Sequence, residues 1–131
     1  MLSFLDHLST KTEHERANAF YEYLKRKAWD NGVPLIGLFE LTPRCTLNCE
    51  MCYVHLSPSQ MKRDELTTEQ WISLIDEACD AGMLYATLTG GECLLYPGFR
   101  QIYENLQFRG VRVTILTNGT LLDEEMVTWL S

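Results

Sequence analysis

Three cysteines within eight residues constrain this 131-residue chain more than any other feature. Cys45, Cys49 and Cys52 follow the spacing C-x3-C-x2-C and come directly after a strand-like run. Thiolates this close together can converge on one metal centre if the loop that joins them curls. A closed zinc or iron–sulfur site usually takes four ligands, so three leave one position open for another group. An open position is what a reactive metal site needs and a purely structural site does not.

Strand-like and helical patterns alternate along the chain. Residues 34–42 form an apolar run with little alternation, which predicts a strand buried on both faces. Thr67 and Gln70 form the capping-box pattern that starts a helix. The predicted strands cover residues 34–42, 84–89 and 111–117, and the predicted helices cover residues 12–29, 67–82, 98–108 and 123–131. This order, with short connections, indicates an α/β fold of parallel strands with right-handed crossovers.

Composition excludes several classes of function. A net charge of -7 argues against a phosphate-binding surface and therefore against a nucleic-acid partner. The first eight residues lack a basic region and an apolar stretch of signal-peptide length, and no run reaches membrane-spanning length. The chain is therefore expected to be cytoplasmic and to have no membrane partner. In that compartment thiols stay reduced, so clustered cysteines favour metal binding over disulfides.

A second motif, Gly90-Gly91-Glu92, follows the strand predicted at residues 84–89. Together with the cysteine spacing, and in the same order along the chain, it resembles the radical S-adenosylmethionine (SAM) superfamily. The resemblance implies a partial (β/α) barrel of the radical SAM type, truncated after about three βα units. Residues 1–33 are then an N-terminal helical extension and residues 34–131 are the N-terminal half of the core domain. Both motifs follow strand ends, which is the face where βα barrels carry their chemistry.

The resemblance also implies two cofactors, a [4Fe–4S] cluster and SAM. Cys45, Cys49 and Cys52 would ligate the cluster, and the amino and carboxylate groups of SAM would occupy the open iron. The activity implied is that of an oxidoreductase or maturase that cleaves SAM reductively to a 5′-deoxyadenosyl radical. A low-potential electron donor of the flavodoxin or ferredoxin type would serve it. No catalytic side chain of the protein itself is assigned.

The predicted SAM-binding residues are Met51, Gly90, Gly91, Glu92 and Thr117. The Met51 thioether would pack near the adenine, or it only fills space under the loop. Gly90 and Gly91 let the backbone approach a ligand closely and adopt positive φ, so a side chain at Gly91 is expected to weaken SAM binding and leave iron in place. Glu92 would accept a hydrogen bond from the SAM amine, or it would help to fix the loop.

Three other positions are less specific. Thr117 is a possible ligand contact, whereas an Asn-Gly turn suffices to explain Asn118 and Gly119. Cys93 stands where the family commonly has proline, and small apolar packing is expected for it rather than a fourth ligand role. Cys79 is expected to lie in the core.

One alternative of a different class stays open on the residues alone. Cys45, Cys49, Cys52 and His55 could hold a structural zinc ion in a small, non-catalytic interaction module. Within the radical SAM interpretation the substrate is not identified. Residues 38–54 and 88–99 resemble radical SAM enzymes that modify peptides or proteins, which favours a substrate of that class. The truncated chain is expected to be poorly soluble and inactive by itself, because half a barrel leaves apolar strands uncovered.

Overall fold

The computed structural model describes residues 12–52 and 64–131, which divide into two units, one ending at Leu35 and one spanning Ile36–Ser131. The first unit contains helix α2 (Glu13–Asp30), close to the predicted bounds. Thr12 caps this helix through a capping box with Glu15, in which each side chain accepts a hydrogen bond from the other residue's backbone N–H. Glu13 and Glu15 favour the positive end of the helix dipole.

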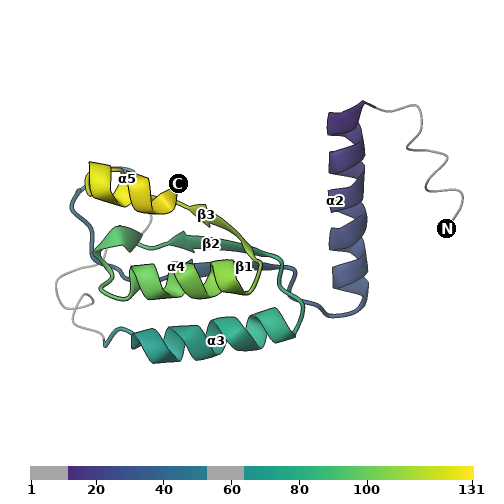
Figure 1. Ribbon diagram of the computed structural model, residues 1–131, viewed down its shortest axis with the longest axis horizontal. Coiled ribbons are helices and arrows are strands. Elements are labelled where there is room, and N and C mark those ends of the chain that lie inside the picture. Colours follow the sequence, from purple (N-terminus) through teal and green to yellow (C-terminus); the bar gives the residue numbers. More distant parts are fainter. Residues whose placement is uncertain (1–11, 53–63) are drawn as a thin grey trace, which may run out of the picture. The chain divides into compact units, whose positions relative to one another are not determined.

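The second unit is a three-stranded parallel sheet in which a helical segment connects each strand to the next along the chain (Figure 1). Its elements are β1 (Ile36–Glu40), α3 (Thr68–Asp80), β2 (Tyr85–Thr89), the 3-10 turn η1 (Cys93–Leu95), α4 (Phe99–Phe108), β3 (Arg112–Ile115) and α5 (Glu124–Leu130). The strands lie in the order β1-β2-β3, and both pairings are parallel. The predicted α/β fold of parallel strands is therefore confirmed, and the sheet does not close within the described residues. Only η1 was not predicted.

The helix starts follow from the sequence. Thr67 caps α3 through the predicted capping box, accepting from the backbone N–H of Gln70, while the Gln70 side chain accepts from that of Thr67. Asp123 caps α5 by accepting from the backbone N–H of Met126. These caps set where each helix begins after the preceding loop.

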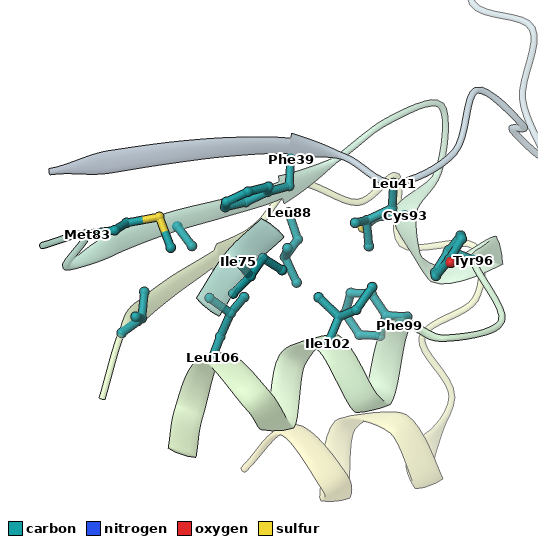
Figure 2. Close-up of a cluster of buried hydrophobic side chains, with 12 residues drawn as sticks. Phe39, Leu41, Ile75, Met83, Leu88, Cys93, Tyr96, Phe99, Ile102 and Leu106 are labelled. Carbon is teal, nitrogen blue, oxygen red and sulfur yellow. The ribbon is translucent and has the colours of Figure 1, made fainter. Parts of the chain in front are cut away.

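The core lies on one face of the sheet. Phe39, Ala86 and Leu88 point from this face toward helices α3 and α4, which contribute Ile75, Ile102 and Leu106. Figure 2 shows Phe39 and Leu88 of the strands on the side of the sheet that faces Ile102 and Leu106 of α4. Ile75, Leu88, Ile102 and Leu106 are fully buried. This packing holds the carboxyl ends of the three strands in a fixed relation.

The other face of the sheet is open in the described chain. Ile36 and Leu38 alternate with the inward-facing Phe39 and are 48% and 62% exposed. The prediction that residues 34–42 are buried on both faces is therefore wrong for this structure. The physical reason is that both covering helices, α3 and α4, pack on the same face, so alternate residues of β1 have no partner layer.

None of the helices in the described part of the chain combines the length and apolar character that a membrane span requires.

Candidate functional site

The cysteine loop begins where β1 ends. Leu41 and Thr42 are buried beyond the strand, and the chain then emerges into a loop in which Cys45, Cys49 and Cys52 are all exposed and not in disulfides. The backbone N–H of Cys52 donates to the carbonyl of Cys49 at 3.1 Å, a tight turn between the last two cysteines. The structure thus brings the three thiols onto one short exposed loop.

The thiols do not form a closed metal-binding arrangement. Within residues 12–52 and 64–131, no three His, Cys, Asp or Glu side chains are grouped closely enough to hold a metal ion. Ligand loops often close only when the metal binds, because a preformed site carries like charges or thiols without compensation. Met51, between the last two cysteines, is 94% exposed. His55, the fourth ligand of the zinc alternative, lies outside the described residues.

An ion pair closes the base of this loop. Both guanidinium nitrogens of Arg44 that face Glu65, Nε and Nη2, donate to its carboxylate at 2.9 Å, and the Thr42 hydroxyl donates to the same carboxylate. Partial burial raises the pKa of Glu65, but the hydrogen bonds from Arg44 and Thr42 and the charge of Arg44 outweigh it, so the pKa is lowered overall. The pair joins the residue before Cys45 to the segment that enters α3.

The glycine motif packs against the start of the cysteine loop. The N–H of Gly91 donates to the carbonyl of Thr42 at 2.8 Å, and the N–H of Glu92 donates to that of Arg44 at 2.7 Å. A Cβ on Gly90 would lie 2.3 Å from the Thr42 carbonyl oxygen, and one on Gly91 would lie 2.4 Å from that of Arg44. Gly90 also has φ of 142°, which L-residues rarely adopt. Both glycines are therefore required by contact with the chain's own backbone.

Glu92 is a fully buried carboxylate with internal partners. It accepts from the backbone N–H of Leu94 at 3.0 Å and from that of Asn118 at 2.8 Å. The Thr117 hydroxyl donates to its two oxygens at 2.9 and 3.0 Å. Of the two roles considered for Glu92, the structure displays the fixing of the loop: its carboxylate ties the turn after β2 to the turn after β3. Thr117 serves the same connection.

Asn118 is the functional candidate that sequence reasoning missed. Its side-chain Nδ2 donates to Sγ of Cys45 at 3.5 Å and to the hydroxyl of Thr46 at 3.0 Å. Thr46 also shares a hydrogen bond of 2.7 Å with Thr120. An Asn-Gly pair after a strand is usually read as a turn, and nothing in the local sequence points to a contact more than seventy positions away.

The two remaining cysteines are structural. Cys93 is fully buried and its thiol donates to the carbonyl of Leu116 at 3.4 Å. Burial, and next the charge of Glu92, raise the pKa of Cys93 to about 12, so it stays a neutral thiol. Cys79 packs against the core from α3. The expected packing of Cys93 is confirmed, whereas Cys79 is only partly buried and lies at the edge of the core.

Comparison with known proteins identifies the family. The model of the family described as "Radical SAM superfamily" matches residues 39–130. The chain is 36% identical over 98 residues to the antilisterial bacteriocin subtilosin biosynthesis protein AlbA of Bacillus subtilis, covering 75% of this chain and 21% of that protein. It is 36% identical over 97 residues to the PqqA peptide cyclase of Granulibacter bethesdensis, covering 72% of this chain and 25% of that protein.

Other relatives differ in their named chemistry. The AdoMet-dependent heme synthase of Methanosarcina barkeri is 39% identical over 94 residues, covering 72% of this chain and 27% of that protein. Among solved structures, Streptococcus suis SuiB bound to the precursor peptide SuiA matches 92% of this chain and 27% of its own, with a TM-score of 0.63 and 22% identity. At that identity the likeness shows the fold. The chain spans about a quarter of the length of these proteins.

These matches favour the radical SAM interpretation over the zinc module. The superfamily uses SAM and a [4Fe–4S] cluster, and its members related to this chain are enzymes. The match begins within β1 and ends in α5, so it includes the cysteine loop, the glycine motif and the turn after β3. The chain belongs to the radical SAM superfamily.

Proposed function

We propose that Cys45, Cys49 and Cys52 ligate a [4Fe–4S] cluster, and that the whole protein binds SAM there and cleaves it reductively. The observation that carries this proposal is the position of three exposed cysteines, none of them in a disulfide, on a loop whose base is hydrogen-bonded to the glycine motif. The donor set fits the group: three thiolates suit iron–sulfur ligation, and the N–H of Leu47 already donates to Sγ of Cys45 at 3.4 Å.

The carbonyl oxygens of the Gly90-Gly91 turn are the acceptors that we assign to the SAM amino group. The position of the turn supports this role, because its backbone is hydrogen-bonded to the start of the cysteine loop. We assign Glu92 and Thr117 to holding this turn, since their side chains already bond each other. Met51 is proposed to contact the adenine, and its exposure supports access to a ligand.

When bound, the cofactors would supply one-electron reduction of the SAM sulfonium, which breaks a C–S bond to give methionine and the 5′-deoxyadenosyl radical. The chain's own residues ligate, orient and fix. Cys93 does not compete as a ligand, because its pKa of about 12 keeps it protonated and its side chain is buried. A low-potential donor of the flavodoxin or ferredoxin type is proposed to supply the electron.

A peptide or protein is the proposed substrate class. Two relatives carry names that concern peptides, a bacteriocin biosynthesis protein and a peptide cyclase, and the structural neighbour SuiB is bound to a precursor peptide. The heme synthase, of similar identity, is named for a different substrate, so the proposal needs a direct test. Incubation of the reduced protein with SAM and a candidate precursor peptide should change the mass of the peptide, and porphyrins should remain unaltered.

The experiment that tests the cofactor proposal is anaerobic reconstitution of the whole protein with iron and sulfide. The product should be brown, absorb at about 400 nm as iron–sulfur thiolate centres do, and release 5′-deoxyadenosine when SAM and dithionite are added. Stoichiometric zinc that survives mild chelation, with no uptake of iron and sulfide, would instead support the zinc module.

A further inference from the structure

Hydrogen bonds fix the orientation of the Asn118 side-chain amide in the turn after β3. Its Oδ1 accepts from the backbone N–H of Thr120 at 2.9 Å and from the Thr120 hydroxyl at 2.7 Å. Because two donors occupy this oxygen, the orientation of the amide is set by the network, and Nδ2 must face the other way. On that side lie Sγ of Cys45 at 3.5 Å and the hydroxyl of Thr46 at 3.0 Å.

The backbone of Asn118 is equally constrained. Its N–H donates to the buried carboxylate of Glu92 at 2.8 Å, and the adjoining Thr117 hydroxyl donates to the same group. A chain of bonds thus runs from the turn after β2, through Glu92 and Asn118, to the first cysteine. A simple Asn-Gly turn requires only the local bonds to Thr120, so the contact with Cys45 is an additional feature.

We propose that Asn118 is a positioning residue that donates an N–H···S hydrogen bond to the Cys45 thiolate and thereby raises the reduction potential of the cluster. This inference rests on the proposed role of Cys45 as a ligand. Hydrogen bonds to the sulfurs are among the factors that set iron–sulfur potentials, because they stabilise the more negative, reduced form. Cys45 receives a second such donor from the backbone N–H of Leu47 at 3.4 Å, which no side-chain substitution removes.

The test compares three variants of the whole reconstituted protein. Asn118→Asp keeps the size and the oxygen that Thr120 contacts but removes the N–H donor, and Asn118→Leu removes it without adding charge. Thr120→Val is the matched control: it deletes the hydroxyl that donates to Asn118 Oδ1, but the backbone N–H of residue 120, which donates to the same oxygen at 2.9 Å, remains to hold the amide. The readouts are iron content and the midpoint potential of the cluster in an EPR-monitored titration.

The midpoint potential of both Asn118 variants should be more negative than that of wild type by up to about 59 mV, which corresponds to about a tenfold change in the equilibrium of a one-electron couple. Thr120→Val should match wild type. Loss of iron in both Asn118 variants would overturn the proposal, because it would mean that Asn118 holds the loop together and does not tune the potential. Unchanged potentials, a shift in Asn118→Asp alone, or iron loss that includes Thr120→Val would overturn it. Failure of wild type to take up a cluster would instead refute the proposed function.

Discussion

Substitution of Gly91 by alanine tests how the glycine motif and the cysteine loop depend on each other. The new Cβ would lie 2.4 Å from the carbonyl oxygen of Arg44 and 2.5 Å from that of Pro43, where ordinary contact starts at 3.4 Å. Both obstacles are backbone atoms, so no side chain can move aside. Gly91 has no positive φ, and the cost is therefore steric. The two segments must separate by about 1 Å.

That separation would stretch two backbone hydrogen bonds, Gly91 to Thr42 and Glu92 to Arg44, beyond bonding distance. Each is worth about 0.5–1.5 kcal/mol, and overpacking adds about 1–3 kcal/mol. A local destabilisation of about 3 kcal/mol follows, which corresponds to amide hydrogen exchange about 100-fold faster at these positions. Since the displaced segment carries Cys45, iron content after reconstitution should fall as well. From the sequence alone, only SAM binding is expected to suffer.

The assay is hydrogen exchange by mass spectrometry on the whole protein, together with iron analysis. Gly110→Ala is the control, because a Cβ there has no atom within 4 Å, although its φ of 72° adds some strain. The control should leave exchange at Gly91 and iron content unchanged. Wild-type exchange and wild-type iron in Gly91→Ala would refute the reasoning that these two segments are interlocked.

Three further predictions follow from the same contacts. The pKa of Glu65 is lowered, so its pair with Arg44 stabilises the fold above pH 4.5, and this stabilisation is lost as the pH falls from 4.5 through the lowered pKa. On acidification, the free energy of unfolding of wild type should therefore drop more than that of Glu65→Gln, as followed by circular dichroism during urea unfolding. Parallel curves for the two proteins would contradict this. Cys93 has a pKa of about 12 and is fully buried, so it should resist alkylation by iodoacetamide in the native apoprotein. Peptide mass spectrometry should find the exposed Cys45, Cys49 and Cys52 alkylated instead. Prompt labelling of Cys93 would argue against its burial. The 131-residue chain should self-associate through the open face of its sheet, and Leu38→Thr should reduce the apparent mass in light scattering; a monomeric wild-type chain would contradict this.

Local signals in the sequence were sufficient to predict most of the elements. The capping box at Thr67 and Gln70 places the start of α3, and the alternation of strand-like and helical patterns predicts the parallel sheet, because short connections leave few other topologies. The burial of β1 was predicted wrongly, since an apolar run reveals what a strand can bury and not whether a layer covers it. Leu38 is the clearest case.

The site shows the same division. Cysteine spacing and the glycine motif are local patterns and could be found directly. The hydrogen bonds that join the two motifs could not be predicted, because Glu92, Thr117 and Asn118 come together only when the strands pair. The sequence also does not distinguish a buried glutamate from an exposed one. The glycines are a related case. Sequence reasoning explains their lack of a side chain by the close approach of a ligand, whereas in the structure the chain's own backbone lies where a Cβ would be.

The most direct test of the central claim, that Cys45, Cys49 and Cys52 hold the cluster, is iron and sulfide analysis with EPR spectroscopy on five alanine variants of the reconstituted protein. Cys45→Ala, Cys49→Ala and Cys52→Ala should each lose the cluster, because a [4Fe–4S] centre with only two protein thiolates is poorly held. Cys79→Ala and Cys93→Ala should keep it, since Cys93 is buried in the core and Cys79 packs against the core from α3. Retention of the cluster by any of the first three variants, or its loss in Cys93→Ala, would contradict the account.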